Sequence, residues 1–249
     1  MTTESVSEKC RALRLNTCMR QLAAVVQMAA EKNWAALKTI EHLLELELEA
    51  RRQTQMLLRF KQSKLCETPT IDQFDFNFHS SRKNQKGKIL QLLTLQFLSE
   101  KKDIILIGNP GVGKSFLAKI VAYAATQQGF KVLFTTAMDM INHLVAAEAD
   151  HSLLKKLHHY ACPQLLLIDE LGFLPIDKAG ADLLFQVISQ RYEQGALVIT
   201  SNRAFKDWPE IFNNDSTLTS AILDRLLHHA ETVIIEGKSF RMKDSLPPQ

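Results

Sequence analysis

Gly108-Asn109-Pro110-Gly111-Val112-Gly113-Lys114-Ser115 is the stretch that decides the fold. It matches the spacing G-x-x-x-x-G-K-[ST] of a phosphate-binding loop at every fixed position. An apolar run (104–107) precedes it and a helix-like run (116–122) follows it, as that loop requires. Its glycines let backbone N–H groups turn toward phosphate oxygens, and the following helix adds a positive dipole end. We predict that this stretch and Phe116 bind ATP, with Lys114 on the β- and γ-phosphates and Ser115 on Mg²⁺.

Two acidic residues follow a second buried-type run. Leu165-Leu-Leu-Ile168 leads directly into Asp169 and Glu170. Four apolar residues before two acids indicate a parallel strand with carboxylates at its C-terminal end, where open α/β sheets bind ligands. We predict that Asp169 belongs to the Mg²⁺ shell. Binding ATP needs only this carboxylate, so the second acid suggests hydrolysis, with Glu170 orienting and deprotonating the attacking water.

A third strand candidate, 196–200, ends in Ser201-Asn202-Arg203. An amide at a strand tip between the other two strands is suited to hold the same water. The alternative for Asn202 is a helix cap or a turn residue.

Short apolar runs alternate with helical runs from residue 101 onward. Strands are expected at 104–107, 131–135, 165–168, 196–200 and 232–235, and helices near 114–128, 138–160, 178–194 and 217–228. This alternation predicts an α/β fold, a parallel sheet with helices on both faces.

The chain before this core is expected to be helical. Leu15, Met19, Leu22, Val26 and Ala29 mark one helical face, and a second helical run extends from Trp34 to about Lys64. We predict a helical N-terminal domain of two or three helices (1–68), a linker and entry helix (69–100, the helix from Lys83 to Leu98) and the ATP-binding core (101–249).

Three aromatic residues of the linker, Phe74, Phe76 and Phe78, are expected to pack on the core. The alternative is that one of them lines an adenine pocket.

Composition bounds the class of protein. The chain has 249 residues, of which 46% are hydrophobic and 23% charged, as in a globular protein. No apolar run approaches the length of a membrane span and the N-terminus is polar, so a cytoplasmic protein is expected. The four cysteines form no metal-binding spacing and are predicted to be reduced. The pairs His158-His159 and His228-His229 are predicted to be solvated, because adjacent residues on a helix diverge.

Positive charge is concentrated in the first part of the chain. Residues 1–100 hold 15 Lys and Arg against 11 Asp and Glu, and residues 101–249 hold 15 against 16. A basic run that includes Arg51 and Arg52 ends the second N-terminal helical run. It is consistent with DNA contact, and equally with a hairpin whose basic end satisfies the helix dipole.

Four segments together resemble the IstB-type ATP-binding proteins of insertion sequences. They are Gly108–Ser115, Leu165-Leu-Leu-Ile-Asp-Glu-Leu-Gly-Phe-Leu-Pro175, the stretch from Arg191-Tyr-Glu to Val198-Ile-Thr-Ser-Asn202, and Ser220-Ala-Ile-Leu-Asp-Arg-Leu226. That family lies close to the DnaC-type helicase loaders and further from DnaA, and all are AAA+ P-loop ATPases. The resemblance covers nearly the whole chain, and it implies an AAA+ core preceded by the helical domain.

The resemblance also implies roles that spacing does not show. Arg225 matches the segment that supplies an arginine finger to a neighbouring subunit's ATP site, which requires a homo-oligomer; the alternative is a surface ion pair with Asp224. Arg241 falls near the position of a second sensor arginine, but the chain ends eight residues later, so a lid role is in doubt. In this clade an extra helix after the second strand lines the DNA path, which points to Lys155 and Lys156 as phosphate contacts, or else to a solvated face.

The expected function is an ATP-hydrolysing, DNA-remodelling regulator of transposition. ATP would join subunits on duplex DNA, and this complex would recruit or stimulate a cognate transposase. The alternative is a DnaC-like helicase loader that acts on single-stranded DNA and a replicative helicase. A small-molecule kinase and a non-hydrolysing ATP-gated scaffold are less favoured, because no acceptor site is recognisable and Glu170 is present.

Overall fold

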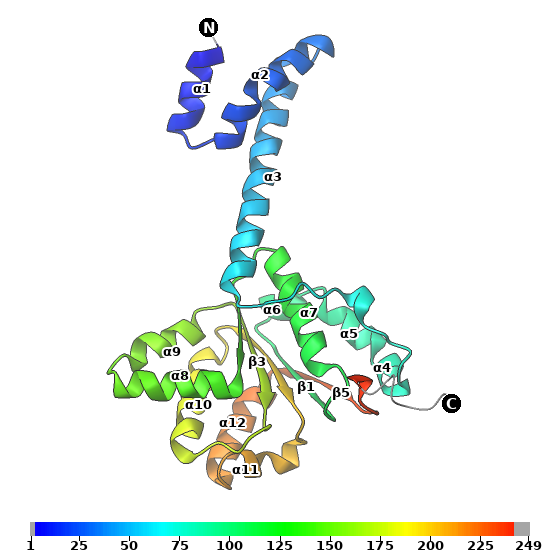
Figure 1. Ribbon diagram of the computed structural model, residues 1–249, viewed down its shortest axis with the longest axis vertical. Helices are drawn as coiled ribbons and strands as arrows, with labels where there is room; N and C mark the ends of the chain where they lie inside the picture. Colours follow the sequence, from blue (N-terminus) through cyan, green and yellow to red (C-terminus); the bar gives the residue numbers. More distant parts are fainter. Residues whose placement is uncertain (1–2, 242–249) are drawn as a thin grey trace. The chain divides into compact units, whose positions relative to one another are not determined.

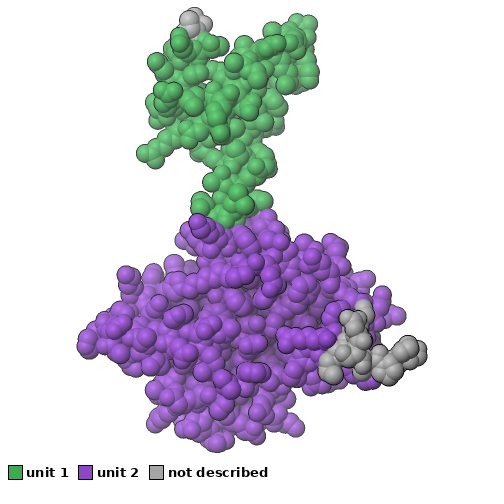
Figure 2. All heavy atoms as spheres, viewed as in Figure 1, with its two compact units in different colours: residues 1–58 green, residues 59–249 purple. Residues whose placement is uncertain are grey.

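The computed structural model describes residues 3–241. The chain separates into two compact units, with the boundary between Leu58 and Arg59 (Figure 2). The boundary falls within one long helix, because its last residues pack on the second unit. Arg59 Nε donates to the Gly129 carbonyl at 3.1 Å, and the ring of Phe60 meets Tyr123 edge to face.

Three helices build the first unit: α1 (Thr3–Ala12), α2 (Asn16–Glu31) and α3 (Ala36–Gln62), which runs past the boundary. The buried carboxylate of Glu47 links α3 to the start of α2. Glu47 accepts from the Thr17 and Cys18 N–H groups at the start of α2, at 2.7 and 3.1 Å. Arg51 Nε donates to its other oxygen at 2.9 Å. Burial raises the pKa of Glu47, but these bonds outweigh it and hold the pKa below its usual value.

The second unit contains a five-stranded parallel sheet in the order β2-β3-β4-β1-β5. Its strands are β1 (Asp103–Gly108), β2 (Val132–Thr136), β3 (Leu165–Leu171), β4 (Ala196–Ser201) and β5 (Ala230–Ile235). The predicted α/β fold is therefore confirmed. The order places β4 between β1 and β3, so the C-terminal ends of these three strands lie side by side.

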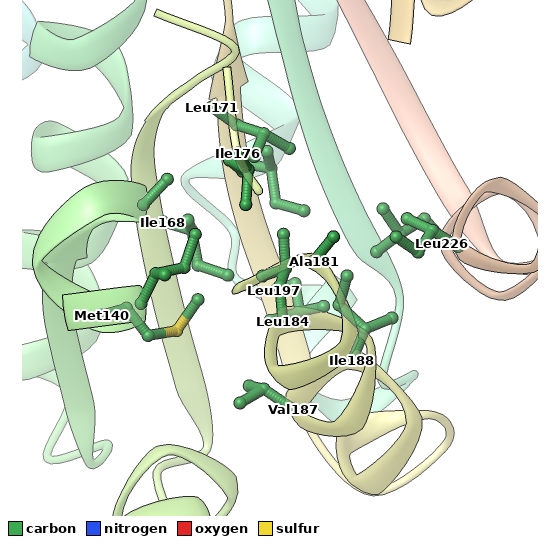
Figure 3. Close-up of a cluster of buried hydrophobic side chains, with 14 of the residues drawn as sticks. Met140, Ile168, Leu171, Ile176, Ala181, Leu184, Val187, Ile188, Leu197 and Leu226 are labelled. Atoms are coloured by element: carbon green, nitrogen blue, oxygen red, sulfur yellow. The ribbon is translucent and has the colours of Figure 1, made fainter. Parts of the chain in front are cut away.

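Side chains alternate across this sheet and fill two cores. Ile168 and Leu197 point into one, beneath α8 (Ala137–Ala149), α9 (Leu153–Ala161), α10 (Lys178–Arg191), α11 (Trp208–Ile211) and α12 (Ser216–His228) (Figure 3). Leu167 and Val198 belong to the other, beneath α7 (Lys114–Gln127) and the short helices α4 (Ser80–Asn84), α5 (Lys86–Leu92) and α6 (Gln96–Ser99). Figure 1 shows these two helical layers on opposite faces of the sheet. Burial of both faces explains the continuous apolar runs of β1, β3 and β4.

Two helices expected to be continuous are interrupted. The segment expected as one helix from Lys83 to Leu98 is built from α4, α5 and α6, because Leu95 adopts φ 58° and turns its side chain into the core. The helix expected over 138–160 breaks between α8 and α9, where His151 has φ 56°. Neither break contains a glycine, so the local sequence does not predict that the helices end there.

Short 3₁₀ turns at Ile71–Gln73 and Phe205–Asp207 complete the elements. All four cysteines are free thiols. None of the helices within residues 3–241 combines the length and the apolar character needed to cross a membrane.

Candidate active site

The predicted phosphate-binding loop connects the end of β1 to the start of α7. Gly111 and Gly113 have φ values of 77° and 99°, which side chains rarely allow. A Cβ on Gly113 would lie 2.8 Å from Arg82 Nη2 and 3.0 Å from the Phe74 ring. Glycine is thus required at Gly113 both by backbone conformation and by space. The loop closes around the buried side chain of Lys114.

Lys114 is held inside this loop by two of its carbonyl groups. Its Nζ donates to the oxygens of Gly108 and Asn109 at 2.8 and 2.9 Å. Burial lowers the pKa of Lys114, and the positive charge of Arg241 adds to this, whereas Asp169 and Glu170 oppose it. The ammonium is therefore pre-positioned between the loop and the two acids.

A β-bulge presents the two acids differently. β3 and β4 are paired at Ile168 and again at Leu171, and one extra residue of β3 is accommodated between these pairs. Asp169 is buried, whereas Glu170 is exposed with φ 62° and lines the cleft. Strained backbone of this kind is common at functional sites. The bulge aims Glu170 out of the strand ladder while Asp169 stays within it.

Thr200 on β4 organises this bulge, and the sequence analysis did not single it out. Its hydroxyl donates a short hydrogen bond to Asp169 Oδ1 and accepts from the Glu170 N–H at 3.0 Å. One side chain thereby fixes the positions of both acids. The only sequence signal was a hydroxyl residue at the end of a neighbouring strand.

Asn202 follows the end of β4, between the loop and the bulge. Among the described residues, its buried Oδ1 has no hydrogen-bond partner. It lines a cavity of about 80 Å³ together with residues from all three strand ends: Pro110, Gly111, Lys114, Ser115, Glu170, Phe173, Thr200 and Arg241. A buried amide oxygen without a partner is unusual and marks Asn202 as a candidate functional residue. No helix begins at Asn202, so the helix-cap alternative is wrong, whereas the turn-residue alternative agrees with its position in the bend after β4.

Arg82, at the end of the linker, supports the phosphate-binding loop through hydrogen bonds to its backbone. Its guanidinium donates twice to the Val112 carbonyl, at 3.1 and 2.7 Å, and once to the Asp75 carbonyl at 2.8 Å. It lies against the rings of Phe74, Phe78 and Phe240, 4.5, 5.3 and 5.1 Å from their centroids. Sequence reasoning missed Arg82, because a buried arginine and a solvated arginine look the same in a linker.

A second cavity of about 360 Å³ opens beside the loop. Phe74 lines it and also belongs to the core, so the two readings of the linker aromatics are compatible for this residue. Phe116 lines the same cavity, and Arg241 lines both cavities. The Phe240 N–H donates to the Gly111 carbonyl at 2.8 Å, which ties the segment carrying Arg241 to the loop. The residues after Arg241 lie outside the described part of the chain.

Other predicted residues lie away from these cavities. Arg225, on α12, stacks over Phe185 at 4.5 Å and donates to the Ala221 carbonyl at 3.2 Å. It does not occur among the described residues that line either cavity.

The predicted DNA-contacting residues differ in their surroundings. Lys155 is exposed on α9 and lines a separate basic cavity with Arg59 and Lys131, while Lys156 is half-buried. Arg52 is exposed, but Arg51 is engaged by Glu47 and by the Arg14 carbonyl at 2.8 Å.

The residues present fit a nucleotide with a magnesium ion. Ser115 and Asp169 offer hydroxyl and carboxylate oxygens, the donor types that Mg²⁺ prefers. The glycine loop, the buried Lys114 and the unpartnered oxygen of Asn202 are the features that a triphosphate and an attacking water require. The fold and this site define a P-loop ATPase of the AAA+ class.

Comparison with known proteins specifies the family. The model of the IstB-like ATP binding proteins matches residues 8–247. The ATP-binding protein of insertion sequence IS5376 from Geobacillus stearothermophilus is 37% identical, over 97% of this chain and 95% of its own. That of IS21 from Pseudomonas aeruginosa is 34% identical, over 93% and 86%. The chain belongs to the IstB-like ATP binding protein family.

Solved structures agree on the fold. The DnaC helicase loader superposes with a TM-score of 0.56 at 20% identity, covering 67% of this chain and 96% of that one. AMPPCP-bound DnaA from Aquifex aeolicus superposes with a TM-score of 0.59 at 19% identity, covering 73% and 54%.

Proposed function

We propose that the protein hydrolyses ATP at the cleft between β1, β3 and β4. The observation that carries this proposal is the convergence of Lys114, Glu170 and Asn202 on one cavity at adjacent strand ends. Residues Gly108–Phe116 enclose the triphosphate, and the larger cavity beside Phe74 accepts the nucleoside. The Lys114 ammonium leaves the loop carbonyls for the β- and γ-phosphates.

Hydrolysis then depends on a positioned water. Asn202 Oδ1 accepts one of its hydrogens, and Glu170 removes a proton as the water oxygen bonds to the γ-phosphorus. The bond from that phosphorus to the bridging oxygen breaks, and ADP and phosphate leave. Ser115 and Asp169 would hold Mg²⁺, which neutralises charge on the phosphate oxygens. Thr200 keeps both acids in place through its two hydrogen bonds.

We propose further that Arg225 completes the ATP site of a neighbouring subunit. Its location on α12, outside the described lining of its own chain's cavities, supports a role in trans. An arginine supplied in this way stabilises charge on the transferred phosphoryl group and is worth about 10³-fold or more in rate. The active form would then be a homo-oligomer.

Family membership supports the cellular role. Relatives named as insertion-sequence ATP-binding proteins lead us to infer a cytoplasmic regulator of transposition that assembles on duplex DNA and recruits a cognate transposase. The exposed Lys155 and Arg52 and the half-buried Lys156 are candidates for phosphate contacts. A base-reading module is not part of this proposal, so sequence preference is expected to be weak.

The test is ATP turnover and assembly size, measured with duplex DNA, with single-stranded DNA and without DNA. Lys114→Ala and Arg225→Ala should each abolish DNA-stimulated turnover, and mixing the two variants should restore part of it, because each lacks a different half of a shared site. Glu170→Gln should trap ATP-bound oligomers on duplex DNA. Turnover that ignores DNA in a monomeric protein contradicts the proposal, and stimulation by single strands alone favours a helicase loader.

A further inference from the structure

The second histidine pair does not lie on one helix. His228 is the last residue of α12, and His229 follows with φ −132° and ψ 48°, outside helical geometry. The divergence expected of adjacent helical residues therefore does not apply to this pair. Both rings are exposed, and their centroids are 4.1 Å apart.

A carboxylate completes the cluster. Glu193 lies in the turn after α10, and its Oε1 is 3.6 Å from His229 Nε2. One ligand atom from each of Glu193, His228 and His229 falls within 4.8 Å of the others. In a tetrahedral zinc site with bonds of about 2.0–2.2 Å, ligand atoms are about 3.5 Å apart. The Glu193–His229 separation matches this value, and His228 contributes the third ligand atom within 4.8 Å.

The backbones of these residues are anchored. Glu193 has φ 57° in a turn closed by the N–H groups of residues 194 and 195, which both donate to the Arg191 carbonyl, at 2.8 and 3.1 Å. The His229 carbonyl accepts from the Asp103 N–H at 2.9 Å, at the edge of β1. Metal binding would therefore mainly cost the conformational entropy of the three ligand side chains.

Tyr192 contacts one of the two ring nitrogens of His228. The Tyr192 hydroxyl is 2.7 Å from His228 Nδ1. A hydrogen bond at Nδ1 leaves Nε2 free, which is the usual arrangement when an oxygen partner orients a metal-binding imidazole. Imidazole with carboxylate suits Zn²⁺, Cu²⁺ or Ni²⁺, whereas Mg²⁺ and Ca²⁺ prefer oxygen ligands alone.

We propose that Glu193, His228 and His229 form a surface site for a divalent transition-metal ion such as Zn²⁺, with Tyr192 as a positioning residue. The ion would join the turn after α10 to the end of α12. Arg225 lies three residues before His228 on α12, so bound metal would also restrain the helix end that carries it. This last consequence rests on the proposed function, whereas the metal site does not.

The test uses the full chain without a histidine tag, in excess Mg²⁺ to occupy oxygen-only sites. Zn²⁺ binding is measured by calorimetry, and Co²⁺ binding by visible absorption. We expect one ion per chain, and a Co²⁺ spectrum without thiolate charge-transfer bands. The double variant His228→Ala/His229→Ala should lose this binding, and Glu193→Gln should weaken it at least tenfold. Tyr192→Phe should weaken it about 10–100-fold.

The chain supplies a matched control in its other histidine pair. His158 and His159 both lie within α9 and are exposed among basic residues. His158→Ala/His159→Ala should leave the affinity unchanged. Equal losses from both double variants, or no stoichiometric binding by the parent, would overturn the proposal. Thiolate bands in the Co²⁺ spectrum would assign the ion to cysteines instead, and unchanged binding by Tyr192→Phe would remove its positioning role.

Discussion

Replacing Arg82 by methionine tests whether the linker shapes the nucleotide site. Methionine keeps most of the length and apolar contact of the side chain but removes its charge and donors. The change deletes three hydrogen bonds, two to the Val112 carbonyl and one to the Asp75 carbonyl. Hydrogen bonds from a charged donor are worth about 1.5–3 kcal/mol each, but the two that share one acceptor do not count fully. We expect the free energy of unfolding to fall by about 3–5 kcal/mol.

Part of this loss should appear in ATP affinity. Val112 lies inside the loop, so releasing its carbonyl frees the N–H groups that must face the phosphates. In the variant the loop would have to become ordered when ATP binds. If this ordering costs about 1.4–2.8 kcal/mol of binding free energy, the Kd for ATP rises about 10–100-fold. The assay is equilibrium binding of a fluorescent ATP analogue beside urea unfolding. Arg82→Lys keeps the positive charge but lacks the planar guanidinium with its several donors, so it should give an intermediate Kd.

Lys88→Met is the matched control for this experiment. Lys88 on α5 donates to the Thr232 carbonyl at 2.8 Å and pairs with Glu231 at 3.8 Å, so it also ties a short helix to the core. It does not occur among the described residues that line the two cavities beside the phosphate-binding loop. This variant should lose stability without a change in Kd. If Arg82→Met also lowers stability but leaves the Kd unchanged, the loop is shaped without Arg82 and the reasoning fails.

Three further changes have defined outcomes. Thr200→Val should lower ATP turnover about tenfold or more with little change in ATP affinity, because Asp169 and the Glu170 N–H lose their shared hydroxyl; steady-state kinetics that match the parent would contradict this. Burial raises the pKa of Asp103 to about 7, so the unfolded chain ionises first and stability falls as pH rises from about 4 to 7. Asp103→Asn should remove this fall, which is about 4 kcal/mol when the pKa moves from 3.8 to about 7, and parallel pH profiles of urea unfolding would refute it. Glu47→Ala should destabilise the first unit, because it removes the buried acceptor of two N–H groups at the start of α2. We expect the free energy of unfolding to fall by about 2–4 kcal/mol, as followed by circular dichroism. Melting identical to that of the parent would show that the contact is dispensable.

The sequence alone determined the parallel sheet and the succession of its strands along the chain. Each predicted strand overlaps an observed one, because strands buried on both faces must be continuously apolar and are interrupted by polar turns. The phosphate-binding loop could also be predicted from the sequence, because its chemistry needs glycine, lysine and a hydroxyl residue at set spacing along one segment. Asp169 and Glu170 stood out for a related reason, because two acids directly follow an apolar run; in the structure both lie within β3, which continues to Leu171.

Only the tertiary structure decided contacts between distant segments. Arg82 reaches Val112 across thirty residues, and Thr200 reaches Asp169 across thirty-one, and neither partner pair has a local pattern. The break at Leu95 likewise follows from the burial of its side chain in the core, and neither it nor the break at His151 is marked by glycine or proline. The same holds for the approach of Glu193 to His229. Spacing along a chain records local geometry, whereas these contacts depend on how the sheet and its helices bring separate segments together.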